Sequence, residues 1–165
     1  MEIEIDLTQG KVALIDEADW PLVSGFGWYA VKDRNIWYAQ ANTSRKEGPR
    51  RTVRMHRLLL GLTDQKIKID HRDGNGLNNR RTNLRACTHA QNLWNTVAHA
   101  NNTSGFKGVS WDKQSGRWKA QIRGDLKKKH IGYFFTPEEA HQAYCRAAID
   151  LHGDFANFGM AGMEA

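Results

Sequence analysis

Hydrophobic and polar residues alternate in short runs over the first third of the chain, which predicts strands rather than long helices. Residues 3–15 form two alternating runs around a Gln-Gly turn, and residues 28–31 and 36–41 form two more around a polar turn. Residues 53–62 have the spacing of a short amphipathic helix, with a strand as an open alternative. This part of the chain contains no obvious catalytic group, so we interpret residues 1–65 as a β-rich support.

A strand–loop–strand–helix unit follows. Residues 66–71 alternate and predict a strand, residues 72–82 are rich in turn-forming residues, and residues 84–86 predict the return strand. Thr88 is a plausible N-cap for a helix that runs through about Val97. Together these segments predict a hairpin with a helix directly after it.

The last third predicts a sheet and a helix after a linker of small polar residues at 98–105. Three strands are expected at about 106–111, 116–123 and 127–135, and the helix at 137–152. Thr136 and Glu139 fit a capping box, with Pro137 at the first helical position. A stripe of mostly small residues would let this helix lie close to the sheet: Ala140, Ala143, Tyr144, Ala147 and Leu151.

Charge is distributed unevenly along the 165 residues, whose net charge is +6 and whose isoelectric point is near 9.5. Residues 1–50 contain six Lys and Arg against eight Asp and Glu. Residues 51–100 contain nine against three, and residues 101–132 contain eight against two. The positive charge therefore lies over the predicted hairpin, helix and sheet, which favours a polyanionic partner such as nucleic acid.

The cysteines and the N-terminus argue against several classes of protein. Cys87 and Cys145 are far apart and form no Cys-x-x-Cys pair, so no structural zinc is expected. They favour reduced thiols in a cytosol, with a disulfide as an open alternative. The acidic N-terminus is unlike a signal peptide, and no apolar run approaches the ~20 residues that span a bilayer. We therefore expect a cytoplasmic protein with no membrane partner.

Four polar residues have a spacing suited to phosphodiester hydrolysis. Asp70 and His71 end the predicted strand, Asn83 follows twelve residues after His71, and Asn92 lies inside the predicted helix. An imidazole suits a general base near neutral pH, and carboxylate and amide oxygens suit a hard divalent cation. Neighbouring strand residues point to opposite sides, so Asp70 could reach a metal while His71 reaches a water.

Each of these residues also has an alternative interpretation. His71 could be a hydrogen-bonded structural histidine, and Asn83 could be only a turn former. His89 lies one turn before Asn92 and is a rival ligand, whereas His56 is expected to pack or to contact phosphate. Four arginines are candidate phosphate contacts that could instead be solvated surface: Arg57, Arg80, Arg81 and Arg85.

The motifs around these residues resemble the phage and intron-encoded subgroup of the HNH nucleases, which have the ββα-metal fold. The resemblance is carried by His56-Arg57, Asp70-His71, the run Asn78-Asn79-Arg80-Arg81-Thr82-Asn83-Leu84-Arg85, and Gln91-Asn92. It implies that His71 is the general base and that Asp70 and Asn92 bind the metal. It further implies that Asn83 holds the loop and the base in place. Asn92 stands where other members have His, which favours Mg²⁺ or Mn²⁺ over zinc.

The second strand of the last third has the clearest alternation in the chain. Its polar side chains are predicted to share one face: Arg117, Lys119, Gln121 and Arg123. The intervening apolar residues would pack on the helix: Trp118, Ala120 and Ile122. A face rich in Arg, Lys and Gln can enter a DNA groove, although an antiparallel sheet with one wetted face needs no ligand.

Further motifs mark residues 105–158: Phe106-Lys107-Gly108-Val109, Ile131-Gly132-Tyr133-Phe134, and the alanines of the last helix. They resemble the plant ethylene-response-factor DNA-binding domain, which reads the major groove with its sheet. The resemblance implies DNA contacts by Lys107, Ser110, Gln121, Arg123, Lys128 and His130. Ser110, Gln121 and His130 replace a usual Arg, Glu and Trp, so the target sequence is expected to differ.

The predicted fold class is α+β, with a β-rich support over 1–65, a ββα-metal hairpin–helix core over 66–97, and a three-stranded antiparallel sheet packed on one α-helix over 106–165. We expect a Mg²⁺- or Mn²⁺-dependent endonuclease of the homing or phage free-standing type. It would act on double-stranded DNA as a monomer or dimer in a bacterial or phage-infected cell. A DNA-binding regulator with an inactive hairpin is the alternative, and an RNA-binding or purely structural protein is a third interpretation.

Overall fold

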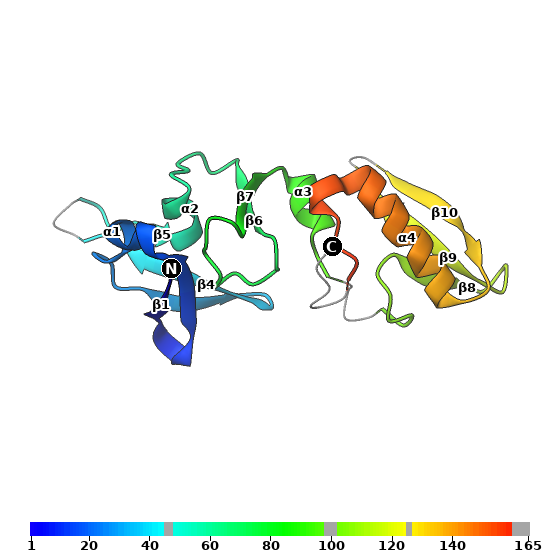
Figure 1. Cartoon of the computed structure of the whole chain (residues 1–165), viewed down its shortest axis with the longest axis horizontal. Helices are drawn as coiled ribbons and strands as arrows, with labels where there is room; N and C mark the ends of the chain where they lie inside the picture. Colours follow the sequence, from blue (N-terminus) through cyan, green and yellow to red (C-terminus); the bar gives the residue numbers. More distant parts are fainter. Residues whose placement is uncertain (45–47, 98–101, 125–126, 160–165) are drawn as a thin grey trace. The chain divides into compact units, whose positions relative to one another are not determined.

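Antiparallel hairpins make up most of the structure, a computed structural model that describes residues 1–44, 48–97, 102–124 and 127–159 (Figure 1). The chain divides into two compact units, Met1–Thr88 and His89–Ala165. The predicted mixture of α and β structure is confirmed. No helix in the described part of the chain has the length and apolar character needed to cross a bilayer.

The first unit is built from short strands and two short helices. Its elements are β1 (Glu2–Asp6), β2 (Val12–Asp16), α1 (Trp20–Val23), β3 (Tyr29–Asp33), β4 (Ile36–Asn42), β5 (Thr52–Arg54), α2 (Met55–Leu59), β6 (Lys68–His71) and β7 (Leu84–Cys87). The strands pair as β1–β2, β3–β4–β5 and β6–β7. Residues 53–62, predicted as one helix, are divided, because their first part pairs with the edge of β4 and only Met55–Leu59 is α-helical.

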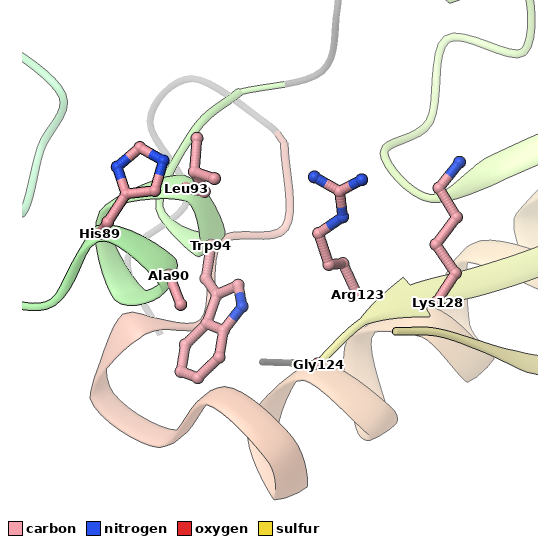
Figure 2. Close-up of a pocket in the computed structure, with 7 residues that line it drawn as sticks. All are labelled: His89, Ala90, Leu93, Trp94, Arg123, Gly124 and Lys128. Carbon is pink, nitrogen blue, oxygen red and sulfur yellow. The ribbon is translucent and has the colours of Figure 1, made fainter. Parts of the chain in front are cut away.

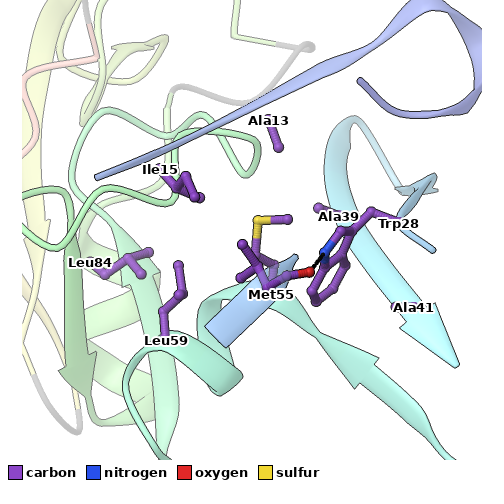
Figure 3. Packing of buried hydrophobic residues seen from close by; sticks show 9 residues of the cluster. Ala13, Ile15, Trp28, Ala39, Ala41, Met55, Leu59 and Leu84 are labelled. Atoms are coloured by element: carbon purple, nitrogen blue, oxygen red, sulfur yellow. Dashed lines mark hydrogen bonds between the residues drawn. The ribbon is translucent and has the colours of Figure 1, made fainter. Parts of the chain in front are cut away.

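The core of the first unit contains residues from almost all of these strands and from α2. Figure 3 shows Ile15, Trp28, Met55 and Leu59 around the same space, and the Trp28 Nε1 donates to the Val23 carbonyl at 2.9 Å. Leu84, the first residue of β7, is part of this cluster. Full burial of each large side chain contributes about 1.5–3 kcal/mol, so the core fixes the β6–β7 hairpin to the N-terminal strands.

The second unit contains a short helix, a sheet and a long helix. Its elements are α3 (His89–Trp94), β8 (Val109–Asp112), β9 (Arg117–Arg123), β10 (Lys128–Phe134) and α4 (Pro137–His152). The antiparallel sheet has the order β10–β9–β8, and α4 packs on it. The predicted capping box is confirmed, since the Thr136 side chain accepts from the Glu139 N–H and the Glu139 side chain accepts from the Thr136 N–H.

The buried face of α4 differs from the predicted stripe at its C-terminal end. Ala148 and His152 are buried, whereas Ala147 is half-buried and Leu151 is 43% exposed. The buried row continues to His152 because that ring finds partners in the interior of the unit, including the Arg123 carbonyl 2.7 Å from its Nε2. The expectation for Leu151 was therefore wrong.

The division between the two units falls after Thr88, so α3 groups with the C-terminal sheet. The helix expected to run through about Val97 ends at Trp94. Residues 98–101 of the predicted linker lie outside the described residues. Its remaining part is a hydrogen-bonded turn, in which the Ser104 hydroxyl donates to the carbonyls of Phe106 and Val109 at 3.0 and 2.9 Å.

Gly108 provides a test of the packing between the sheet and α4. Its φ is +75°, and a Cβ there would lie 2.2 Å from Cδ2 of Tyr144. Gly105 has a similar φ of +77°, but a Cβ there would meet no described atom within 4 Å. Both substitutions to Ala place a side chain in the left-handed region at about 1–2 kcal/mol, and only Gly108→Ala adds overpacking of about 1–3 kcal/mol.

We expect urea unfolding to show a larger loss of unfolding free energy for Gly108→Ala than for Gly105→Ala. Equal losses would contradict the close approach of the Gly108 backbone to Tyr144.

Candidate functional site

The β6–β7 hairpin places Asp70 and His71 at the end of β6. Asp70 lies opposite Arg85 and His71 lies opposite Leu84 in the antiparallel register. Both side chains are 6% exposed, and they leave the strand on opposite faces because successive residues of a strand alternate. By this alternation the hairpin separates the Asp70 carboxylate from the His71 imidazole.

His71 lies in an aromatic environment supplied by the first part of the chain. Its ring centroid is 5.3 Å from that of His56 and 5.9 Å from that of Tyr38. Burial lowers the pKa of His71 below its usual value, and the Asn79 side chain and the Asp73 and Asp70 carboxylates oppose this shift. The imidazole is consequently neutral at pH 7, which is the form that can accept a proton.

His56 is a packing partner of His71. It is 6% exposed, and its ring makes an edge contact with Tyr38 at 5.7 Å between centroids. Burial is the largest cause that lowers the pKa of His56 to about 3, followed by the neighbouring His71 and Arg54. His56 Nδ1 has no hydrogen-bond partner among the described residues, which suits a neutral ring within the interior.

Asp70 forms a short ion pair with Arg85 across the hairpin. Arg85 Nε and Nη2 lie 2.7 and 2.6 Å from Asp70 Oδ2, and both side chains are at most 10% exposed. Charge-assisted bonds of this length compensate the buried carboxylate. Arg85, a predicted phosphate contact, is thus bound to the predicted metal ligand.

Asn83 stabilises the loop that joins the two strands. Its Nδ2 donates to Asp73 Oδ1 at 3.0 Å and to the Asn78 carbonyl at 2.8 Å, and its Oδ1 accepts from the Asp73 N–H at 3.1 Å. Asn78 Nδ2 donates in turn to Asp73 Oδ2 at 2.7 Å. These bonds agree with the expected role of Asn83 in holding the loop; its expected role in orienting the His71 ring stays a prediction.

The same loop is attached to the N-terminal strands. The Leu14 N–H donates to the Leu77 carbonyl at 2.9 Å, and the Asn79 N–H donates to the Leu14 carbonyl at 2.7 Å. A Cβ at Gly76 would lie 2.4 Å from the Trp37 carbonyl oxygen, so the loop backbone touches β4 at a point where only Gly fits. The N-terminal strands therefore support the site.

The other arginines near the hairpin also have partners within the first unit. Arg81 forms a fork with Asp19 through contacts of 2.7–3.0 Å, and Arg80 lies 2.8 Å from Glu2. Arg57 donates to two backbone carbonyls that precede β6. Their contribution to phosphate binding stays a prediction, but each guanidinium braces the hairpin or its surroundings. The sequence did not reveal the ion pairs of Arg80 and Arg81, because Glu2 and Asp19 are distant from them in the chain.

The metal ligands that the sequence predicts, Asp70 and Asn92, would both bind a cation through oxygen atoms. Within the described residues, no group of three His, Cys, Asp or Glu side chains gathers to hold a metal. A hard cation commonly takes one or two oxygen ligands from a protein, with water and phosphate as its other ligands, so the metal role of Asp70 stays a prediction. Asn92 lies on α3 in the second unit, and its metal role stays a prediction.

The predicted polar face exists on the C-terminal sheet. The strand register pairs Gln121 with His130 and Arg123 with Lys128. Ser110 pairs with Lys119, and Arg117 extends over the Phe135 ring at 4.5 Å. Ala120 and Ile122 are buried on the opposite face as expected, so the sheet presents a row of cations and hydrogen-bonding groups to solvent.

Lys107 does not belong to this polar row. Its Nζ donates to the Trp94 carbonyl at 2.6 Å, and burial lowers its pKa to about 8. The DNA contact implied for Lys107 stays a prediction, while the structure gives this side chain a partner at the end of α3.

Comparisons with known proteins agree with the two parts of the chain. Residues 56–93 match the HNH endonuclease family, and residues 104–154 match the AP2 domain. Protein 3.8 of Escherichia phage T7 is 34% identical over 112 residues, which cover 68% of this chain and 92% of that protein.

Two further relatives match. An uncharacterized HNH endonuclease of Acanthamoeba polyphaga mimivirus is 29% identical over 153 residues, which cover 90% of this chain and 74% of that protein. An ethylene-responsive transcription factor of Arabidopsis thaliana is 32% identical over 108 residues, which cover 61% of this chain and 65% of that protein. No solved structure matches the chain.

The depressed pKa of His56 predicts an acid-sensitive first unit. Between pH 6.5 and about 3 the unfolded chain binds a proton at His56 that the folded chain does not. The free energy of unfolding should therefore fall as pH decreases through this window, by up to about 5 kcal/mol from this residue. Urea unfolding of His56→Phe between pH 4.5 and 7.5 should show a slope of unfolding free energy against pH that is smaller than in the wild type by up to one proton. An unchanged slope in His56→Phe would contradict the buried neutral ring.

Proposed function

We propose that this chain, whose residues 56–93 match the HNH endonuclease family and whose residues 104–154 match the AP2 domain, is a metal-dependent endonuclease that hydrolyses phosphodiester bonds in double-stranded DNA. The observation that carries this proposal is the buried His71 with its lowered pKa, held at the end of β6 with the Asp70 carboxylate on the opposite face.

In this proposal His71 is the general base that takes a proton from the attacking water. The aromatic contacts with His56 and Tyr38 hold the ring in place, and burial keeps it unprotonated. Asn83 keeps the loop beside it closed through Asp73 and Asn78. The products would be a 3′-hydroxyl and a 5′-phosphate.

Asp70 and Asn92 would hold Mg²⁺ or Mn²⁺ through one carboxylate and one amide oxygen. When bound, the cation would supply positive charge to the transition-state phosphoryl group and the leaving oxygen. Arg85 balances the negative charge of Asp70 before the cation binds. After binding, its guanidinium would remain beside the carboxylate as a second positive charge.

The sheet of the AP2 domain would locate the DNA site by entering the major groove. Arg123 and Lys128 pair across β9 and β10, and Gln121 and His130 form the next row. Arg and Gln side chains suit base edges, and Lys suits phosphate. The described residues contain one such hairpin, so a monomer would nick one strand and a dimer would be needed to cut both.

One observation favours a second candidate function. The Asp70–Arg85 ion pair occupies the carboxylate that the nuclease needs, as expected for a DNA-binding regulator with an inactive hairpin. Supercoiled plasmid incubated with Mg²⁺, Mn²⁺ or chelator distinguishes the two functions, since the regulator would bind the plasmid without cutting it.

His71→Ala tests the general base. We expect plasmid cleavage to slow by about 10²–10⁴-fold, the usual effect of losing such a group, with DNA affinity in chelator unchanged within about twofold. His89→Ala removes an exposed imidazole from α3 and should retain cleavage, because the metal is assigned to Asn92. Cleavage by His71→Ala at the wild-type rate would remove His71 from this role.

Arg123→Ala and Lys128→Ala test the sheet. Each phosphate contact that is lost should reduce the slope of log K against log salt by about 0.9, so both variants should bind more weakly and with a shallower salt dependence. Lys32→Ala, a cation of equal charge in the first unit, should keep the wild-type slope. Unchanged slopes in the sheet variants would count against docking of this face in the groove.

A further inference from the structure

The helix that completes the HNH match packs within the DNA-binding unit. The match extends to residue 93, yet the compact unit that contains the AP2 domain begins at His89 and includes all of α3. Figure 1 shows α3 beside the C-terminal end of α4. The end of the HNH match and the boundary between the two compact units therefore differ by the helix α3.

A ring stack attaches α3 to the end of α4. The Trp94 indole lies 4.4 Å from the His152 imidazole between centroids, with 10° between the planes. His152 is buried at the last position of α4, and its Nε2 lies 2.7 Å from the Arg123 carbonyl at the end of β9. The indole is thus connected through one ring to both the long helix and the sheet.

Two further contacts hold the C-terminal end of α3. Lys107 Nζ donates to the Trp94 carbonyl at 2.6 Å, which satisfies a terminal carbonyl and places a cation at the negative end of the helix. Asn157 Nδ2 donates to the Asn95 carbonyl and to its Oδ1 at 3.0 and 3.2 Å. Lys107 precedes β8 in the sequence and Asn157 follows α4. Two separate segments of the second unit therefore hold the end of α3.

The length of α3 makes these contacts necessary. The helix has six residues, whereas isolated helices shorter than about 12–15 residues are marginal in water. Its residues are at most half-buried, so a hydrophobic face of its own contributes little. The helix that presents Asn92 is therefore stable only while the C-terminal unit holds it.

The same unit places α3 next to predicted DNA contacts. Arg123 and Lys128 line a shallow pocket of about 250 Å³ whose other wall is formed by His89, Leu93 and Trp94 of α3 (Figure 2). Figure 2 shows the Arg123 guanidinium and the Lys128 ammonium on the sheet side of this pocket. The edge of the sheet expected to meet DNA thus borders the helix that carries Asn92.

We propose that Trp94 and His152 are positioning residues of the nuclease: their stack holds α3, and with it Asn92, on the body that binds DNA. This inference rests on the proposed function, in which Asn92 is a metal ligand. The affinity of the nuclease site for its cation would then depend on a contact made inside the DNA-binding unit.

The experiment uses the full chain with Trp94→Ala and His152→Ala. Trp94→Phe and His152→Phe retain a planar ring for stacking and serve as conservative rescues. Trp20→Ala removes an indole that is 47% exposed in the first unit and is the matched control. Three quantities are measured: the Mg²⁺ concentration for half-maximal plasmid cleavage, DNA affinity in chelator, and hydrogen exchange of the amides at 93–95.

We expect the two Ala variants to need at least tenfold more Mg²⁺ and to lose exchange protection in α3, with DNA affinity unchanged within about threefold. The Phe variants should recover most of both properties, and Trp20→Ala should match the wild type. An unchanged Mg²⁺ requirement in folded Ala variants would overturn the proposal. The proposal would also be overturned if the Ala variants lost DNA affinity and thermal stability together while their Mg²⁺ requirement stayed unchanged. That result would show that the stack only stabilises the fold.

The outcome also separates this inference from the proposed function. A wild-type chain that cuts no DNA with any divalent cation would refute the nuclease, and the positioning role with it. A wild type that cuts, beside Ala variants with an unchanged Mg²⁺ requirement, would refute the positioning role alone.

Discussion

The attachment of the β6–β7 loop to the N-terminal strands is the constraint on which the part of the structure that matches the HNH family depends. A backbone bridge to Leu14 and the fork between Arg81 and Asp19 fix the loop from outside. Asp73 and Asn83 close it from within. A loop so rich in turn formers would otherwise lose much conformational entropy on ordering. With the loop fixed, His71 can be buried against a wall that the N-terminal strands and α2 provide.

Charge and burial are divided between the two faces of β6. On one face, His71 and His56 share an interior that disfavours protonation of either ring. On the other face, Asp70 is buried with its charge compensated by Arg85. Arg80 and Arg81, which the sequence suggested as phosphate contacts, pair with Glu2 and Asp19 of the same unit. In the second unit, Arg123, Lys128 and His130 of the sheet are exposed.

The boundary between the two compact units lies after Thr88, whereas the HNH match continues to residue 93. The HNH match includes α3, while the packing of α3 depends on Trp94, His152 and Lys107 in the unit with the AP2 domain. A helix of six residues is not stable in isolation, so the tertiary contacts that it makes determine its position. The position of Asn92 is therefore set by contacts inside the second unit.

The sequence by itself determined the hairpins, the capping box of α4 and the class of the fold. It also determined that Asp70, His71 and Asn83 lie on one hairpin. These features follow from alternation, turn chemistry and capping, which act over a few neighbouring residues. Only the tertiary structure decided that residues 52–54 join a sheet, that His152 rather than Leu151 faces inward, and that α3 groups with the C-terminal unit. It also selected the arginine partners, such as Asp19 for Arg81 across 62 positions. Such pairings depend on which distant segments meet in space, and a local pattern of residues contains no information about that meeting.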